Sequence, residues 1–126
     1  MQSSDSLFFF EKMPGALPLF DSFESRLSQA VGAYTTRVQK TQITYSNRHV
    51  FACVSFLKVR KAQQRPPVYL VITFGLARKV ESPRIDAAVE AYPGRWTHHV
   101  LIAAPEEIDE ELMGWIREAY YFSASK

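Results

Sequence analysis

Three arginines of this chain lie beside turn-forming residues, a position from which side chains often contact ligands. Arg48 follows Asn47 in a predicted turn, Arg84 follows Ser82-Pro83, and Arg95 follows Pro93-Gly94. A guanidinium group can donate two parallel hydrogen bonds to a carboxylate or a phosphate. If these side chains converge with nearby basic and aromatic residues, they form a pocket for an anion. The candidate ligand-binding residues are Arg48, Arg84, Arg95, His99, Lys40 and Tyr92.

Local ion pairing is the competing explanation for these arginines. Glu81, Asp86 and Glu90 lie close to them in the sequence, and an acidic segment follows Pro105. Surface ion pairs place arginines at the ends of helices and strands as readily as ligand sites do. The sequence leaves both explanations open, because it does not show whether the side chains share one concave surface.

The histidines do not form a pattern typical of a metal site. His98 and His99 are adjacent in a predicted strand, so their side chains point to opposite faces, and His49 is remote in the sequence. If Val100 and Ile102 face the core, His98 points inward and His99 points to the other face. Zinc and iron need three or four convergent ligands, so we predict no metal site.

Catalytic motifs are also missing from the sequence. Cys53, the single cysteine, lies among apolar residues in a predicted strand, and no Gly-x-Ser-x-Gly motif or glycine-rich phosphate loop is present. We therefore predict no cofactor. An enzyme remains the alternative to a binding domain, with His99 of the same pocket acting as a general acid or base.

Hydrophobic periodicity predicts an α+β fold. Spacings of three and four predict one helix from Pro14-Gly15 to Gly32 and another from Pro105 onward, and Ser82-Pro83 predicts a short helix to Glu90. Between them, alternation predicts strands at 36–41, 42–46, 49–59, 68–75 and 96–103. We expect an antiparallel sheet of about five strands, with the N- and C-terminal helices packed on one face and a short helix before the last strand. We expect one domain, 1–126, with residues 1–6 disordered.

One predicted strand has two apolar faces. In residues 49–59, Val50, Ala52, Val54 and Phe56 alternate with Phe51, Cys53, Ser55 and Leu57, which is typical of a central strand. Tyr69, Val71 and Leu101 leave the far face of the sheet partly apolar as well. A homodimer through that face is therefore a hypothesis, since two-fold dimers are the commonest oligomers.

The charge distribution limits the classes of partner. Residues 34–104 carry 11 Lys and Arg against 3 Asp and Glu, a net charge of +8, while the whole chain carries +2. No helix-turn-helix, RNA-binding or zinc-finger motif accompanies the basic loop 58–65, so nucleic acid is an unlikely partner. No segment approaches the roughly 20 apolar residues of a membrane span. The single cysteine, without a signal peptide, indicates a cytoplasmic protein.

Three segments resemble a known family. They are Lys40–Ala52 (KTQITYSNRHVFA), Ser82–Val100 (SPRIDAAVEAYPGRWTHHV) and Glu107–Tyr120 (EIDEELMGWIREAY), and the most specific piece is PGRWTHH. The sequences of these segments and their order resemble the bacterial domain-of-unknown-function family numbered 5655, and the resemblance covers most of the chain after about residue 15. The resemblance implies a compact α+β fold. It brings no activity, substrate or catalytic residue with it.

The leading hypothesis from the sequence is a non-catalytic binding module that recognises an anionic small molecule or partner. The alternatives are an enzyme that uses the same pocket and a structural or oligomerising domain.

Overall fold

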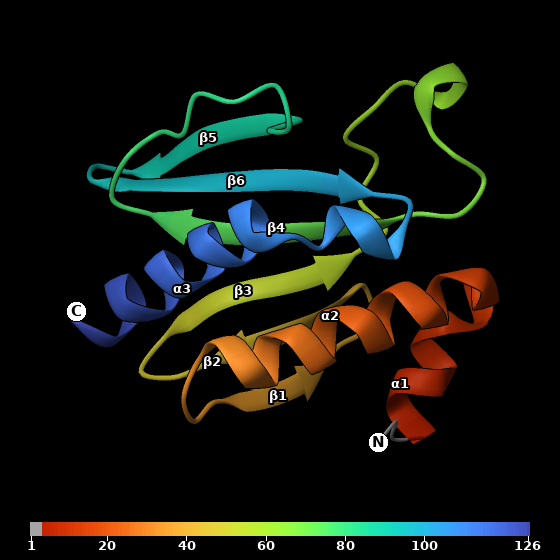
Figure 1. Ribbon diagram of the computed structural model, residues 1–126, viewed down its shortest axis with the longest axis horizontal. Coiled ribbons are helices and arrows are strands. Elements are labelled where there is room, and N and C mark those ends of the chain that lie inside the picture. Colours follow the sequence, from red (N-terminus) through yellow and green to blue (C-terminus); the bar gives the residue numbers. More distant parts are fainter. Residues whose placement is uncertain (1–3) are drawn as a thin grey trace.

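Six antiparallel strands form one sheet, and helices cover one of its faces (Figure 1). The computed structural model describes residues 4–126, with side chains from Leu7 onward. The strands are β1 (Thr35–Val38), β2 (Gln42–Ser46), β3 (Val50–Ser55), β4 (Leu70–Leu76), β5 (Ala87–Tyr92) and β6 (Arg95–Ile102), in the order β1-β2-β3-β4-β6-β5. The α-helices are α1 (Ser4–Phe9), α2 (Leu17–Ala30) and α3 (Glu110–Ala124). The predicted α+β class is confirmed.

The core lies between the sheet and the two long helices. Ile43, Val54, Ile72 and Val100 stand side by side on β2, β3, β4 and β6, because they are directly paired in the sheet register, and all four are buried. The apolar sides of α2 and α3 pack onto this row. Full burial of one such side chain stabilises the fold by roughly 1.5–3 kcal/mol. From α2 and α3 the core receives Leu19, Phe20, Phe23, Leu27, Leu112, Met113, Ile116 and Ala119.

The predicted short helix at 82–90 is wrong. The Ser82-Pro83 signal produces only a turn, in which the Ile85 N–H donates to the Ser82 carbonyl. Residues 87–92 then form β5, which pairs with β6 through a hairpin turn at Gly94, where φ is +83°. Asp86 fixes this arrangement, because its carboxylate accepts hydrogen bonds from the Leu101 N–H and from Arg60. Pairing with β6 satisfies backbone groups that a free helix of this length would leave exposed.

A β-bulge changes the predicted faces of β3. Tyr45 pairs with Ala52 and Ser46 with Val50, so Phe51 is an extra residue in the strand. Phe51 consequently turns to the helical side, where its ring packs against Tyr120 of α3 at a centroid distance of 5.1 Å. The prediction that Phe51 shares a face with Cys53 is therefore wrong.

The last helix begins later than Pro105. Pro105–Glu107 form a 3-10 turn, and the Glu107 carboxylate accepts hydrogen bonds from the Ala103 and Ala104 N–H groups. Asp109 then caps α3 by accepting from the Leu112 N–H at 3.1 Å.

The start of the chain and the far face of the sheet also bear on the predictions. Of residues 1–6, predicted to be disordered, 1–3 lie outside the described residues and the backbone of 4–6 belongs to α1. None of the helices within 4–126 combines the length and apolar composition needed to cross a membrane.

The sequence suggested a homodimer through three residues on the far face of the sheet. These residues, Tyr69, Val71 and Leu101, are buried within the chain. Met13, Phe56 and Val59 pack on them.

His98 is the buried polar residue of the helical face. Its side chain is 0% exposed, and its ring stacks on Phe74 at 5.1 Å. Nε2 accepts a hydrogen bond from the Val80 N–H at 3.0 Å, so the proton of the neutral ring is on Nδ1. Burial lowers the pKa of His98 from its ordinary value.

This histidine makes stability depend on pH. Below about pH 6.5 this histidine takes up a proton in the unfolded chain but resists it in the folded protein. The free energy of unfolding therefore decreases as the pH is lowered, by up to about 1.4 kcal/mol per pH unit for one such residue. We expect His98→Gln, which retains an acceptor but does not titrate, to have a shallower loss of unfolding free energy between about pH 7 and about pH 5.5 in urea titrations. An unchanged slope in the variant would contradict this role of His98.

Candidate functional site

The sheet face opposite the helices carries a row of polar side chains. Cys53 of β3 is paired with Thr73 of β4, and Thr73 is paired with His99 of β6. Because side chains alternate along a strand, these three residues point away from the apolar row that faces α2 and α3. The predicted orientations of His98 and His99 are therefore correct.

Side-chain contacts join neighbouring members of this row in two pairs, one between β4 and β6 and one between β2 and β3. Thr73 Oγ1 lies 2.8 Å from His99 Nδ1, and the Cys53 thiol lies 3.9 Å from Gln42 Oε1 on β2. Burial lowers the pKa of His99 and raises the pKa of the Cys53 thiol. Both groups are consequently uncharged at neutral pH, and the row presents neutral donors and acceptors.

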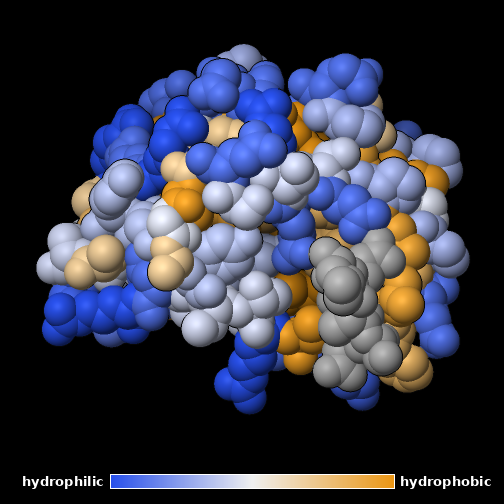
Figure 2. All heavy atoms as spheres, turned by 60° about the horizontal axis from the view of Figure 1, so that its bottom comes forward, coloured by the Kyte–Doolittle hydropathy of each residue, from blue (hydrophilic) through white to orange (hydrophobic). Residues whose placement is uncertain are grey.

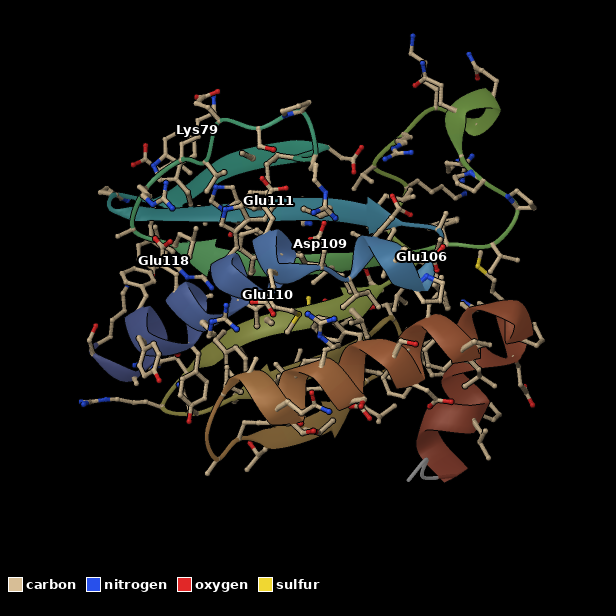
Figure 3. The ribbon with its side chains drawn as sticks, in the orientation of Figure 1. Lys79, Glu106, Asp109, Glu110, Glu111 and Glu118 are labelled. Carbon is tan, nitrogen blue, oxygen red and sulfur yellow. The ribbon has the colours of Figure 1, made fainter. Side chains whose placement is uncertain are left out.

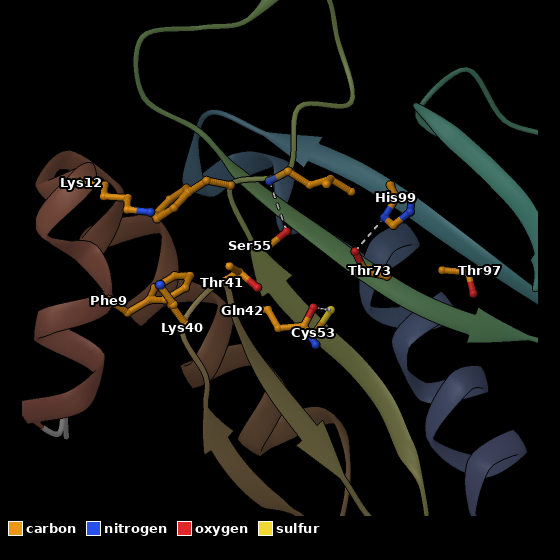
Figure 4. A pocket seen from close by; sticks show the side chains of 12 residues that line it. Phe9, Lys12, Lys40, Thr41, Gln42, Cys53, Ser55, Thr73, Thr97 and His99 are labelled. Carbon is orange, nitrogen blue, oxygen red and sulfur yellow. Dashed lines mark hydrogen bonds between the residues drawn. The ribbon is translucent and has the colours of Figure 1, made fainter.

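A cavity of about 470 Å³ lies over the polar row, and we call it the sheet-face cavity (Figure 4). Its second wall comes from Phe9, Lys12 and the connection between β1 and β2, which supplies Lys40 and Thr41. This volume lies within the range of small-molecule pockets, roughly 300–1,000 Å³. Its floor consists of polar side chains of four strands: Gln42, Cys53, Ser55, Thr73, Thr97 and His99.

The charge of the cavity has one sign. Lys12 and Lys40 line it, and none of its described lining residues is acidic. The hydrogen bonds of the described residues leave His99 Nε2 without a partner, so this nitrogen can contact a ligand. The Ser55 hydroxyl accepts from the Leu57 N–H and retains its own proton for donation.

Arg84 does not belong to this cavity, contrary to the prediction. Its guanidinium contacts Asp109 at 2.7 Å, Glu111 at 3.2 Å and the Glu107 carbonyl at 2.6 Å. These acceptors surround the start of α3, on the helical side of the molecule (Figure 3). For Arg84 the local ion-pairing explanation is correct.

Arg95 and Tyr92 lie together, but in a different place. They line a hollow of about 230 Å³ at the end of the sheet, with His49 and Lys126. The Arg95 guanidinium covers Gly75 so closely that a side chain at position 75 would require it to shift. It also donates a hydrogen bond to the Thr97 hydroxyl at 3.1 Å, and Thr97 lines the sheet-face cavity.

Arg48 is exposed in the turn before β3 and lines neither space. The structure therefore gathers two of the six predicted residues, His99 and Lys40, in one cavity and two others, Arg95 and Tyr92, in a second hollow. Arg48 and Arg84 lie elsewhere.

Several lining residues were not predicted. Lys12 is distant in sequence from the basic segment, and nothing in the sequence indicates that the N-terminal segment reaches the sheet. Thr73 and Cys53 were interpreted as strand residues only. The missing signal was the register that pairs Thr73 with both Cys53 and His99, because this register depends on the strand order. The described residues include no group of three His, Cys, Asp or Glu side chains placed to hold a metal ion.

Arg84 should contribute to stability rather than to ligand binding. Its side chain is only 23% exposed and joins the turn before β5 to the start of α3. We expect Arg84→Met to lower the unfolding free energy by about 1–2 kcal/mol, because charge-assisted hydrogen bonds are lost. Arg48→Met, at an exposed position, is the control and should change it by less than about 0.5 kcal/mol. Equal effects in urea denaturation would contradict this assignment.

Comparison with known proteins identifies the family and no activity. No curated protein and no solved structure matches the chain significantly. A family model matches residues 8–123, which include the polar row, Lys12 and Lys40. The chain therefore belongs to the family described as Domain of unknown function (DUF5655).

Proposed function

We propose that this domain is a non-catalytic binding module that holds a small anionic molecule in the sheet-face cavity. The observation that carries the proposal is the set of lining residues: Lys12, Lys40 and His99 line the cavity, and none of its described lining residues is acidic. By contrast, most arginines of the described chain pair with a carboxylate, including Arg60 with Asp86 and Arg78 with Glu118.

The polar floor supports binding of a ligand with hydrogen-bonding groups. An anion near Lys40 gains Coulomb attraction, which is about 1 kcal/mol at 4 Å in water and larger where water is excluded. Neutral donors such as the Ser55 hydroxyl can replace the water that the ligand loses. This combination of charge at the rim and fixed polar groups in the floor is typical of small-molecule sites.

The layout of charge across the molecule also favours an anion on this face. The acidic residues of α3 and of the preceding turn lie on the helical side, as Glu106, Glu110 and Glu118 show in Figure 3. An anion approaching the opposite face therefore meets lysines first. Such a separation of charge raises the association rate at low ionic strength.

Catalysis in the same cavity is the second candidate function. The contact between Thr73 and His99 favours it, because a hydroxyl 2.8 Å from a neutral imidazole is in reach of a general base. Cys53 supports it less: burial raises the pKa of the thiol, which keeps the nucleophilic thiolate scarce. A ligand recovered chemically unchanged after prolonged incubation would favour the binding module.

Inorganic sulfate tests the binding proposal directly. We expect it to shift the backbone amide signals of Thr41, Cys53 and His99 in NMR titrations. Lys40→Gln should weaken the affinity by about fivefold, because one charge contributes on the order of 1 kcal/mol. Lys79→Gln is the matched control, since Lys79 lies beside Trp96, away from the cavity lining. Shifts confined to Arg95 and Tyr92, or equal effects of both variants, would contradict the proposal.

The affinity for sulfate should rise as pH falls. Burial lowers the pKa of His99, so the ring is neutral at neutral pH and becomes a third cation only below about pH 6.5. Sulfate keeps its charge throughout this range, so tighter binding at low pH reports on the protein. We expect His99→Gln to remove this pH dependence while leaving binding at neutral pH measurable. A dependence that persists in the variant would assign it to another group.

A further inference from the structure

A second cavity adjoins the sheet-face cavity on the side of the N-terminal segment. It has a volume of about 480 Å³ and shares Phe9, Lys12 and Lys40 with the first cavity. Its own lining includes Phe8 and Val38. Because the same three residues line both spaces, the two cavities lie side by side and only these side chains separate them.

The second cavity combines apolar side chains with the charged and polar residues Glu11, Lys12, Gln39 and Lys40, and its most exposed apolar residue is Phe8. Phe8 is 73% exposed, the highest value among the large apolar side chains of the described residues, and its neighbour Leu7 is 47% exposed. Figure 2 shows hydrophobic side chains gathered on this part of the surface, around the N-terminal segment. A contiguous exposed apolar patch of this kind generally marks a binding site.

The charges at the junction distinguish the two ends of a ligand. Lys12 and Lys40 stand between the cavities, and Glu11 lines only the second one. A carboxylate at that place disfavours a second anionic group, but it does not oppose an uncharged chain. The sheet-face cavity is thus suited to an anionic head group, and Phe8 and Val38 of the second cavity can contact an uncharged tail.

We infer that the ligand is an amphipathic organic anion, with a carboxylate or phosphate head in the sheet-face cavity and an aliphatic or aromatic tail against Phe8, Phe9 and Val38. This inference rests on the proposed function, because the head group occupies the same site. The tail covers Phe8, which is 73% exposed among the described residues.

A series of linear carboxylates tests the inference. Acetate, butyrate, hexanoate and octanoate are titrated separately, each below its micellar concentration. We expect affinity to increase by about twofold to fourfold for each methylene group until the tail fills the second cavity, since a buried methylene contributes up to about 0.8 kcal/mol. Octanoate should shift the amide signals of Phe8, Val38 and Gln39, which acetate leaves in place.

Phe8→Ser should flatten this series without weakening sulfate or acetate. Phe8 is exposed, so the variant should keep the melting temperature of the natural sequence. Tyr121→Ser on α3 is the control, because Tyr121 is 64% exposed and lines neither cavity. The variant Lys40→Gln should weaken every member of the series.

The outcomes separate this inference from the proposed function. Equal affinities along the series, with sulfate still bound, would overturn the amphipathic ligand and leave the anion site intact. No binding of sulfate or of any carboxylate would overturn both. Light scattering supplies a third result: a dimer that dissociates in Phe8→Ser would assign the apolar surface to a second copy of the chain, against the inference.

Discussion

The sheet-face cavity depends on one aromatic cluster that holds the N-terminal segment against the sheet. Phe9 stacks on Phe56 at a centroid distance of 5.2 Å, and Phe10 meets the edge of the same ring at 5.5 Å. Phe10 also contacts Phe20 of α2 at 4.8 Å. Phe56 directly follows β3 and packs against the apolar residues of both sheet faces. Without these contacts Phe9 and Lys12 would have no fixed position, and the polar row would lie on an open surface.

The two faces of the sheet have different chemistry because antiparallel strands alternate their side chains. Val54, Ile72 and Val100 meet the helices, whereas Cys53, Thr73 and His99 face the sheet-face cavity. The histidine pair shows the effect within two residues. His98 loses its contact with water and supports the loop at Val80, while His99 keeps one ring nitrogen available. A single strand thus serves the core and the candidate site together.

Much of the fold was predictable, because its signals are local. Apolar spacing located α2 and the body of α3, and alternation located the central strands and the opposite orientations of His98 and His99. The edge strand β5 was missed, since Ser82-Pro83 is a strong local signal for a helix, and the deciding interactions are the hairpin pairing with β6 and the contacts of Asp86 with Arg60 and Leu101. Such tertiary context overrides local preference easily at short segments.

The candidate site was less predictable, since convergence depends on strand order. Lys40 and His99 line opposite ends of one cavity, because β3 and β4 lie between β2 and β6 and form the middle of its floor (Figure 4). Arg84 has the same residue type and a similar local context as Arg95, yet acidic groups of α3 surround it. Residue type and local context alone therefore did not show which arginines pair with acidic groups.

The extra residue in β3 places two consecutive side chains of that strand, Phe51 and Ala52, on the helical side. Alternation resumes at Cys53, because Tyr45 still pairs with Ala52. A chain without Phe51 would therefore have a regular ladder here and would keep Cys53 and Ser55 on the cavity side. Relatives that lack this residue should lose the ring contact with Tyr120 and retain the polar row.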